Sequence, residues 1–317
     1  MARPFLKWAG GKTQLLPILL KVIPESIGTY FEPFLGGGAV FFALSREKRF
    51  RQAILNDYNF ELVETYRAIR NEPENVIEAL KGLPFEREFY EQMRLRQPIS
   101  LSEKAARIIY LNKTSFNGLY RVNQRGQFNV PFGAFSRPPR ILDAPNLLDC
   151  SDALEDALVC NGDFVPAVSV AREGDVVYFD PPYVPINTTS NFTSYTKEGF
   201  TLEDQRRLVI LFRELADRGV KAIASNSDTA TTQELYQEFD VHSVPVRRPI
   251  NSKGSARGFV QEILAFNFPD EKREEKFAEI AKGIAERKER LSRRPLELEG
   301  QVAFNLAMEF DDAEEHT

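Results

Sequence analysis

One stretch, residues 176–185, constrains the fold of this chain more than any other. It begins with Val-Val-Tyr-Phe, four β-forming residues without polar alternation, which is the pattern of a strand buried on both faces. Pro181 and Pro182 lack the backbone N–H that a sheet ladder requires, so the strand must end at Asp180. Strands of this kind belong to open α/β sheets, which bind ligands at the carboxyl ends of their strands. The stretch therefore predicts such a sheet, with Asp180 at its binding edge.

The residues that follow the strand indicate what this edge could do. An acid before two prolines can be no more than a strand end and a rigid turn. Tyr183 favours a site, because two prolines with fixed φ angles can hold the Asp180 carboxylate and an aromatic face around one small planar group.

A glycine turn marks a second part of the same edge. The segment YFEPFLGGGAVFFAL predicts a strand ending near Glu32, a turn and a helix from Ala39. Gly36 to Gly38 would let the backbone approach a ligand at the helix start, although a tight structural turn explains these glycines equally well. Asp57 ends the next strand, where an acid can accept the hydroxyl groups of a ribose. Together these features predict an adenosine-type cofactor.

The N-terminal segment FLKWAGGKT looks like a phosphate loop but lacks its first glycine. Leu6 occupies that position, and no strand precedes it. We expect Gly10, Gly11 and Lys12 to form a loop over the cofactor. Trp8 is then either a flat wall of the site or an ordinary packing residue.

The rest of the chain predicts a sheet that is interrupted by an insertion. Residues 58–107 have the mixed apolar and charged pattern of helices, and Arg125-Gly126 is placed as the turn of a β-hairpin. Further strands are expected at 175–179, 220–224, 241–246 and 262–267, and helices at 201–218 and 269–294. We therefore expect a catalytic domain of residues 1–57 and 146–269, an inserted domain of residues 58–145 and a charged extension of residues 270–317.

The charge distribution favours contact with an anionic partner. Residues 270–317 hold 14 acidic and 9 basic residues, which accounts for the whole net charge of −5. Residues 104–140 hold seven Lys or Arg, residues 242–261 hold four, and neither segment contains an acid. Such segments are either solvated surfaces or sites of phosphate contact, and an acid-free run of this length favours phosphate.

The scarce residue types exclude several classes of protein. With two cysteines and two histidines, the chain has no Cys/His zinc site, and a disulfide framework or a histidine-dependent triad is disfavoured. We find neither an apolar run long enough to span a membrane nor a signal peptide, so we expect a cytoplasmic protein without membrane contact.

These motifs, in this order, resemble those of the Dam-type adenine-specific (N6) DNA methyltransferases of the D12 class, with the alpha motif order. The resemblance covers residues 4–268 through FLKWAGGK, EPFLGGG, NGDF, DPPY, NFTSY, SNSD and RRPINSKGSARG. It implies a Rossmann-like α/β sheet that binds S-adenosylmethionine, with an inserted, mainly helical DNA-recognition domain carrying the β-hairpin. It also implies methylation of adenine N6 in double-stranded DNA, S-adenosylhomocysteine as the product and no metal. The expected protein is a monomer encoded by a bacterium or a phage and associated with the nucleoid, with or without a cognate restriction endonuclease.

The resemblance also implies the roles of individual residues. Asp180, Pro181 and Tyr183 would be catalytic. The cofactor would be bound by Trp8, Lys12, Glu32, Gly36, Gly38, Asp57, Asp163, Phe164 and Asp180. In the hairpin, Asn117, Leu119 and Arg121 match residues that read GATC, and Lys7 matches a further base contact. DNA would also be bound by Arg125, Arg137, Tyr195, Arg247 and Arg248, although any one of these arginines could equally be an ordinary surface residue. Tyr120 departs from many Dam-like sequences, which carry a smaller residue there.

This chemistry explains why an acid stands before two prolines. The lone pair of an aromatic amine is delocalised, so acceptors on Asp180 and on the Pro181 carbonyl would draw N6 towards tetrahedral geometry and stabilise its developing positive charge. Tyr183 would stack on the flipped purine, which is worth about 1 to 3 kcal/mol. The segment 191–195 would close over the base. Because the methyl group of a sulfonium is already activated, no metal is expected.

Other functions are compatible with parts of this pattern. An N4-cytosine DNA methyltransferase uses the same logic but usually has Ser in place of Asp180. A non-catalytic DNA-binding regulator could retain the fold, although an intact set from Asp180 to Tyr183 argues against it. An RNA substrate fits the hairpin less well, and a phosphotransferase would need the missing glycine.

Overall fold

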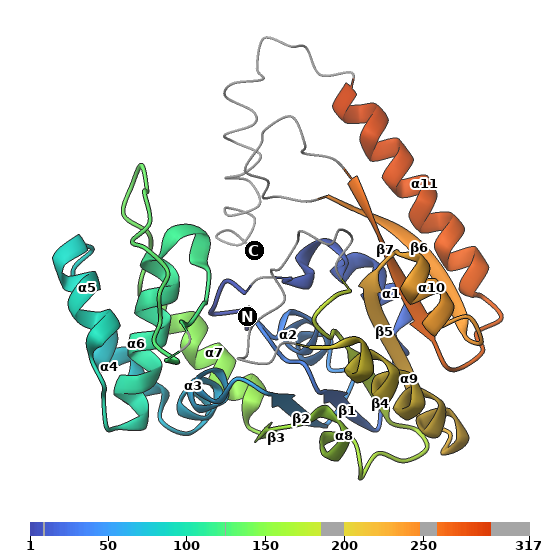
Figure 1. The fold of residues 1–317 in the computed structure, drawn as a ribbon, viewed down its shortest axis with the longest axis horizontal. Coiled ribbons are helices and arrows are strands. Elements are labelled where there is room, and N and C mark those ends of the chain that lie inside the picture. Colours follow the sequence, from blue (N-terminus) through green and yellow to red (C-terminus); the bar gives the residue numbers. More distant parts are fainter. Residues whose placement is uncertain (9, 124, 185–199, 248–258, 293–317) are drawn as a thin grey trace. The chain divides into compact units, whose positions relative to one another are not determined.

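The protein is divided into two compact units, residues 1–269 and residues 270–317. The computed structural model describes residues 1–8, 10–123, 125–184, 200–247 and 259–292. In the first unit these residues form a seven-stranded sheet in the order β3-β2-β1-β4-β5-β7-β6 (Figure 1). In the second unit they form the helix α11 (Arg273–Ser292). Among the described residues, no helix has both the length and the apolar character needed to cross a membrane.

The strand order brings the predicted site residues to one edge. The strands β1 (Thr29–Glu32), β2 (Gln52–Asp57), β3 (Ala157–Asn161), β4 (Val176–Phe179) and β5 (Lys221–Ser227) run parallel to one another. Only β7 (Phe259–Phe266) is antiparallel to both of its neighbours, β5 and β6 (Asp240–Arg247). Because β1 lies between β2 and β4, the carboxyl ends that carry Glu32, Asp57 and Asp180 are adjacent. The expected α/β sheet is confirmed.

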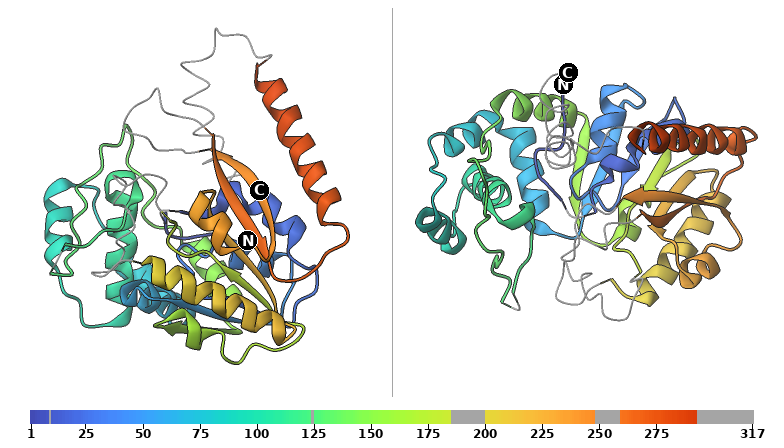
Figure 2. Two further views of the ribbon diagram at one scale, coloured as in Figure 1. Left: turned by 45° about the vertical axis from the view of Figure 1, so that its right-hand side comes forward. Right: turned by 90° about the horizontal axis from the view of Figure 1, so that it is seen from above.

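Helices cover both faces of this sheet, which explains why β4 has no polar residue. All four residues of β4 are buried. On one face, Phe31, Val177 and Phe179 pack in a cluster with Leu208 and Phe212 of α9 (Leu202–Asp217). On the other face, the Tyr30 ring stacks on Phe50, which in turn contacts Phe41 of α2 (Ala39–Arg46). Figure 2 shows α9 and α2 on these opposite sides.

Short helices complete the first unit around the sheet. The expected strands and the helix at 201–218 are present, and Thr201 caps α9 with a reciprocal capping box. The sequence interpretation did not identify β3, nor four helices: α1 (Leu16–Val22), α7 (Ala144–Leu154), α8 (Phe164–Ala167) and α10 (Ala230–Leu235). Leu158, the second residue of β3, is 55% exposed because this strand lies at the edge of the sheet. The strand therefore lacks a buried apolar run.

The segment that follows β2 is helical, as expected, but it is divided into four helices. These are α3 (Phe60–Asn71), α4 (Pro73–Leu80), α5 (Arg87–Leu95) and α6 (Leu101–Thr114). Pro73 starts α4, while Pro84 and Pro98 lie in the two breaks that follow. Each proline removes a backbone donor that a continuous helix would need.

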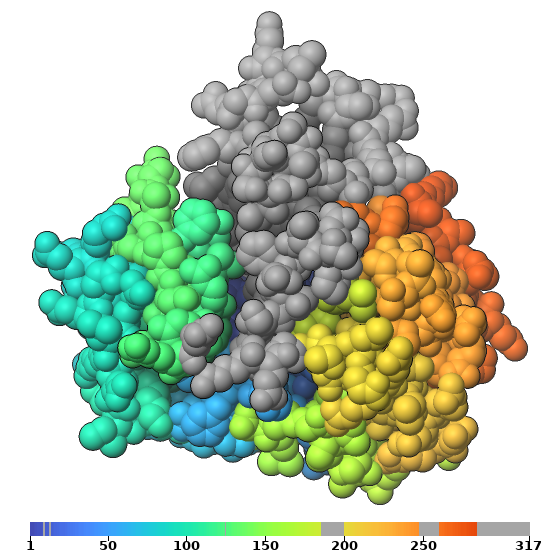
Figure 3. All heavy atoms as spheres, viewed as in Figure 1, coloured from blue at the N-terminus to red at the C-terminus, as the bar shows by residue number. Residues whose placement is uncertain are grey.

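The expected hairpin follows α6 and spans residues 117–133. Its ladder is short, since the described residues show one bridge within it, between Val122 and Phe128. Near the tip, the Gly126 N–H donates to the Asn123 carbonyl, which is the bond that closes a four-residue turn. The hairpin projects beyond the helices α4 to α6 (Figures 1 and 3). Its tip residues are therefore exposed.

Candidate active site

Asp180 lies at the end of β4 in contact with a buried lysine. The Lys12 ammonium is 2.7 Å from Asp180 Oδ1, and the Ser225 hydroxyl donates to the same oxygen at 3.0 Å. The side chains of Lys12 and Asp180 are only 7% and 19% exposed. Burial raises the pKa of Asp180, while Lys12 and Ser225 act in the opposite direction by stabilising the charged form. The result is a carboxylate with a fixed position and little access to water.

The backbone after Asp180 is held by three polar side chains of the sheet and of α9. Gln205 donates to the Pro182 carbonyl at 2.9 Å, Asn226 accepts from the Val184 N–H at 3.1 Å, and Ser227 donates to the Val184 carbonyl at 2.6 Å. Asn226 also donates to Gln205 at 3.0 Å, and both are buried. We call Gln205, Asn226 and Ser227 the clamp, because they fix the path of the segment 180–184.

Tyr183 completes the same cluster. Its hydroxyl donates to Glu262 Oε2 of β7 at 2.8 Å, and Lys12 Nζ is 4.7 Å from the centre of its ring. Burial raises the pKa of Tyr183 well above its usual value, and the nearby Asp180 charge adds to this effect. The neutral phenol is thereby oriented with one face towards Lys12 and with its edge tied to β7.

The glycine turn packs directly against Trp8. Gly36 and Gly38 have φ angles of +49° and +68°, so both adopt the left-handed conformation that glycine favours. A Cβ added to Gly36 would lie 2.9 Å from Trp8 Cδ1, so no larger residue fits there without movement. Asp57 holds the turn, because its Oδ2 accepts from the Gly36 N–H at 2.9 Å and its Oδ1 from the Asn59 N–H at 2.9 Å. Burial raises the pKa of Asp57.

Glu32 is a buried acid between the turn and Asp180. It is 3% exposed, and the Tyr30 hydroxyl donates to its Oε2 at 2.9 Å. Burial, with a further contribution from Asp180, raises its pKa from 4.5 to about 8. Glu32 is therefore mainly protonated at neutral pH in the absence of a ligand.

Asp163 and Phe164 start α8 beside the glycine turn. Asp163 Oδ1 caps the helix by accepting from the Val165 N–H at 2.9 Å, and both carboxylate oxygens are 3.0 Å from an Arg207 nitrogen. The Arg207 guanidinium also lies over the Phe164 ring, 5.1 Å from its centre. Phe164 contacts Phe34 at 5.3 Å between ring centres. The sequence interpretation missed Arg207, because nothing in an amphipathic helix indicates its partner.

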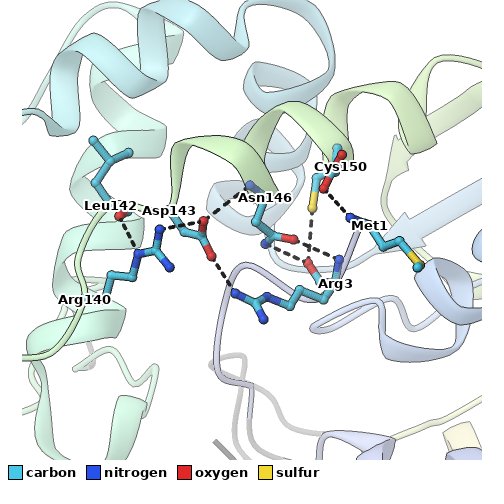
Figure 4. A network of polar contacts seen from close by, with 8 residues as sticks. Met1, Arg3, Arg140, Leu142, Asp143, Asn146 and Cys150 are labelled. Atoms are coloured by element: carbon cyan, nitrogen blue, oxygen red, sulfur yellow. Dashed lines mark hydrogen bonds and ion pairs between the residues drawn. The ribbon is translucent and has the colours of Figure 1, made fainter. Parts of the chain in front are cut away.

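The N-terminal segment reaches this site because α7 and α6 hold it. Arg3 exchanges two backbone bonds with the Asn146 side chain, at 3.0 and 3.1 Å, and its guanidinium pairs with Asp143 at 2.7 Å (Figure 4). Arg140, which the sequence analysis assigned to a basic segment, also pairs with Asp143, at 3.3 Å. Further along, the Lys7 backbone exchanges two bonds with the Asn112 side chain, at 2.8 and 2.7 Å.

The hairpin residues form a second group, in the insertion. Asn117 is exposed and has a φ of +56°, and a Cβ added to the next residue, Gly118, would lie 2.8 Å from Lys7 Cβ. Lys7 thus lies against Gly118 at the start of the hairpin, while Leu119 is half-buried. Arg121 is exposed and donates to the Asn129 side chain at 2.8 Å and to its carbonyl at 3.1 Å. These two bonds use Nε and Nη2 of Arg121, and the guanidinium remains exposed to solvent.

The remaining predicted DNA contacts are only partly described. Arg125 and Arg137 are exposed. The backbone of Arg247 ends β6, whereas Tyr195 and Arg248 lie outside the described residues. Within the described ranges, no group of three or more His, Cys, Asp or Glu side chains could hold a metal ion.

The structure therefore places the predicted catalytic and cofactor residues at one sheet edge and the predicted base readers in the hairpin. The clamp was missed by sequence reasoning. SNSD, residues 225–228, was noted as a motif without a role. The signal in the sequence was a run of polar residues directly after a predicted strand, and the structure shows that Asn226 there is buried and hydrogen-bonded.

Comparisons with known proteins agree with this geometry. Residues 8–250 match the family model for D12 class N6 adenine-specific DNA methyltransferase. The chain is 44% identical to a Type II methyltransferase, M1.LlaDCHI, of Lactococcus lactis subsp. cremoris, over 84% of this chain and 95% of that protein. It is 39% identical to the Type II methyltransferase M.MjaIII of Methanocaldococcus jannaschii, over 84% and 99%. It is 35% identical to a DNA adenine methylase of Escherichia coli K12, over 84% and 96%.

Proposed function

The chain belongs to the D12 class N6 adenine-specific DNA methyltransferases, and from this premise we propose that it methylates adenine within GATC sites of double-stranded DNA. It is an adenine-specific DNA methyltransferase that uses S-adenosylmethionine, and its substrate is DNA. The proposal therefore concerns the recognition sequence, the catalytic steps and the roles of individual residues.

The observation that carries the catalytic proposal is the fixed carboxylate of Asp180. Lys12 and Ser225 both contact the Oδ1 atom of this carboxylate. A target amine could donate to the carboxylate and to the Pro181 carbonyl together, which would localise the N6 lone pair. A charged acceptor also stabilises the positive charge that N6 gains in the transition state. Since the clamp fixes the backbone beforehand, little reorganisation accompanies the reaction.

Tyr183 would orient the target base. Its ring presents a face next to Lys12, and its hydroxyl is anchored on Glu262. Stacking of a purine on such a ring contributes about 1 to 3 kcal/mol per base, comparable with the cost of removing a base from the helix. We propose that Tyr195, outside the described residues, approaches the same base.

The cofactor residues fit the chemistry of a nucleoside that carries an amino acid. S-adenosylmethionine supplies a methyl group that its sulfonium already activates. We propose that it is held by the glycine turn and its neighbours, namely Trp8, Lys12, Glu32, Gly36, Gly38, Asp57, Asp163, Phe164 and Asp180. Asp57 already accepts two backbone bonds, one on each oxygen. Each carboxylate oxygen can accept more than one bond, so a ribose could be added without breaking the turn.

We propose that residues 58–145 are the target-recognition domain and that residues 1–57 and 146–269 are the catalytic domain. The GATC assignment rests on Asn117, Leu119 and Arg121, with Lys7 against Gly118 of the same hairpin. A guanidinium fork reaches O6 and N7 of guanine together, which suits Arg121. Arg125, Arg137, Arg247 and Arg248 would contact phosphates and supply affinity without sequence information.

The test is to sequence DNA from a methylation-deficient bacterial host that expresses the chain, with a method that detects modified bases directly. N6-methyladenine at GATC is the expected outcome, and a host with the empty vector is the control. N6-methyladenine in another motif would overturn the GATC assignment. N4-methylcytosine would favour an N4-cytosine DNA methyltransferase. No modification by a folded protein that binds DNA would favour a non-catalytic regulator.

A further inference from the structure

Tyr120 joins the hairpin to the site at the sheet edge. Its ring stacks on Trp8, with 5.2 Å between ring centres and 27° between planes, and Phe128 meets it edge-on at 5.8 Å. Its hydroxyl donates to Glu61 Oε2 at 2.5 Å. Burial and the Glu61 charge raise the pKa of Tyr120, so the phenol stays neutral. Tyr120 thus has both a ring contact and a polar contact outside the hairpin.

Both of these contacts reach the glycine turn from different directions. Trp8 lies against Gly36, as the 2.9 Å approach of an added Cβ shows. Glu61 belongs to the first turn of α3, which begins shortly after Asp57, and Asp57 accepts from the Gly36 N–H. A displacement of the Tyr120 ring would therefore press on the turn through Trp8 and on its anchoring acid through α3.

The residue after Tyr120 faces the other way. Arg121 is exposed and bonds only across the hairpin, to Asn129, in the contacts described for it. Successive residues of an extended segment point to opposite sides. Tyr120 therefore faces Trp8 and the proposed cofactor site, while Arg121, the next residue, faces the opposite side, where DNA would bind.

We propose that Tyr120 is a positioning residue that couples sequence reading by the hairpin to cofactor binding through its stack on Trp8. The inference rests on the proposed function, because it takes Arg121 as a base reader and the glycine turn as the cofactor site. When cognate DNA fixes Arg121, the Tyr120 ring is fixed as well, and Trp8 is held against the turn. Cofactor binding must then strengthen DNA binding by the same factor, since coupling between two sites is reciprocal.

The strength of the Tyr120–Trp8 stack sets the expected size of the coupling between DNA binding and cofactor binding. An aromatic pair contributes an amount equivalent to a factor of about 2 to 12 in an equilibrium constant. We therefore expect cognate DNA to tighten binding of S-adenosylhomocysteine by a factor in this range.

The chain offers a direct spectroscopic probe of this stack, because Trp8 is its only tryptophan. A GATC duplex, added without cofactor, should change the emission of Trp8 in the native protein and in Tyr120→Phe. It should leave the emission unchanged in Tyr120→Leu, which cannot stack. DNA binding is followed separately through the anisotropy of a labelled duplex.

The second measurement is the dissociation constant of S-adenosylhomocysteine with and without the duplex. Tyr120→Phe should retain the coupling factor, since it keeps the ring and loses only the bond to Glu61. Tyr120→Leu should reduce the factor to about 1, the value for two uncoupled sites. Phe85→Leu is the matched control, because Phe85 contacts Phe132 and Phe135 of the insertion rather than Trp8.

Failure of the inference is distinguishable from failure of the proposed function. If no duplex binds, or if GATC and altered duplexes bind alike, the proposed function fails. If the GATC duplex binds selectively but Trp8 emission stays constant, or if Tyr120→Leu retains the native coupling factor, the inference is overturned. If Tyr120→Leu weakens the binding of DNA and of S-adenosylhomocysteine equally and leaves the coupling factor unchanged, Tyr120 is only a packing residue and the inference is also overturned.

Discussion

The segment 180–184 and the hairpin are held in opposite ways. Asp180 and the backbone that follows it are hydrogen-bonded to side chains of β5 and α9 before any substrate is present. The tip of the hairpin is bonded mainly to itself, through Asn123 and Asn129. Below the tip the hairpin is anchored to the rest of the protein, because Tyr90 donates to the Val130 carbonyl at 2.8 Å and Tyr120 donates to Glu61 at 2.5 Å. A group that stabilises a transition state benefits from being fixed in advance, whereas a reading surface must adjust to DNA.

The largest effect expected from this comparison is at Asp180. Asp180→Ala should lower the rate of methyl transfer by about 10²- to 10³-fold, because the transition state loses its charged acceptor. DNA binding, measured by anisotropy, should be retained. The rate is measured as single-turnover transfer of a labelled methyl group to a duplex. Glu203→Ala, which removes an exposed acid of α9, is the control. Activity within a factor of about ten of the native value would contradict the catalytic role.

The same residue sets the expected pH dependence. Burial raises the pKa of Asp180, so its charged form is lost at a higher pH than for an ordinary aspartate. The rate at saturating cofactor, measured in single turnovers across a pH series, should fall as the pH is lowered through this raised pKa.

A smaller effect should follow from loosening the clamp. Gln205→Leu removes the bond to Pro182 and leaves the Asn226 amide without an acceptor. We expect kcat to fall by up to about 100-fold with little change in the KM for DNA, because misplacement of a reacting group acts on the chemical step. Stability should fall by about 1 to 3 kcal/mol, the cost of an unpaired buried group.

Steady-state kinetics and denaturant unfolding test these two consequences of Gln205→Leu. Gln237→Leu, at an exposed position after α10, is the control. A loss of stability with unchanged kcat would show that the clamp serves the fold alone. Fixing the segment 180–184 in advance would then not contribute to catalysis.

The smallest effects are expected in the hairpin. Arg121→Ala should cost about 1 to 3 kcal/mol on GATC duplexes and much less on duplexes altered at the guanine. Arg125→Ala, at the exposed tip, should weaken all duplexes alike and reduce the salt dependence by about one unit. Binding is measured on matched and single-mismatch duplexes across a salt series. If Arg121→Ala also weakens every duplex equally, the hairpin anchors DNA rather than reads it.

Local sequence patterns were sufficient for much of this fold and for the choice of several candidate site residues. The apolar run of β4, the prolines after it and the Arg125-Gly126 turn each specify their own backbone, so they could be interpreted without tertiary information. Asp180 and Asp57 were chosen as candidates because each lies at the end of a predicted strand. Neighbours along the chain determine all of these features.

What the sequence could not supply are contacts between distant segments. Gln205 lies in an amphipathic helix, and nothing in its neighbours shows that its amide meets Pro182. The Tyr120 ring was noted only as a departure from a family pattern, because its stack on Trp8 depends on how the insertion folds back. The ion pair of Arg207 with Asp163 is hidden for the same reason. Such contacts require the tertiary structure, since many residues of each type could satisfy them.

Because its pKa is raised so far, Glu32 makes the number of protons that the protein binds differ between the folded and the unfolded state. Its pKa is 4.5 in an unfolded chain and about 8 in the folded state, so between these values the folded protein holds a proton that the unfolded chain has released. Folding stability contributed by this group is complete below the lower value and declines as the pH rises towards the upper one. At neutral pH the buried Glu32 therefore lowers the free energy of unfolding. A cation bound beside Glu32 would favour its charged form, so the proton would be released to solution and the lost stability would be restored.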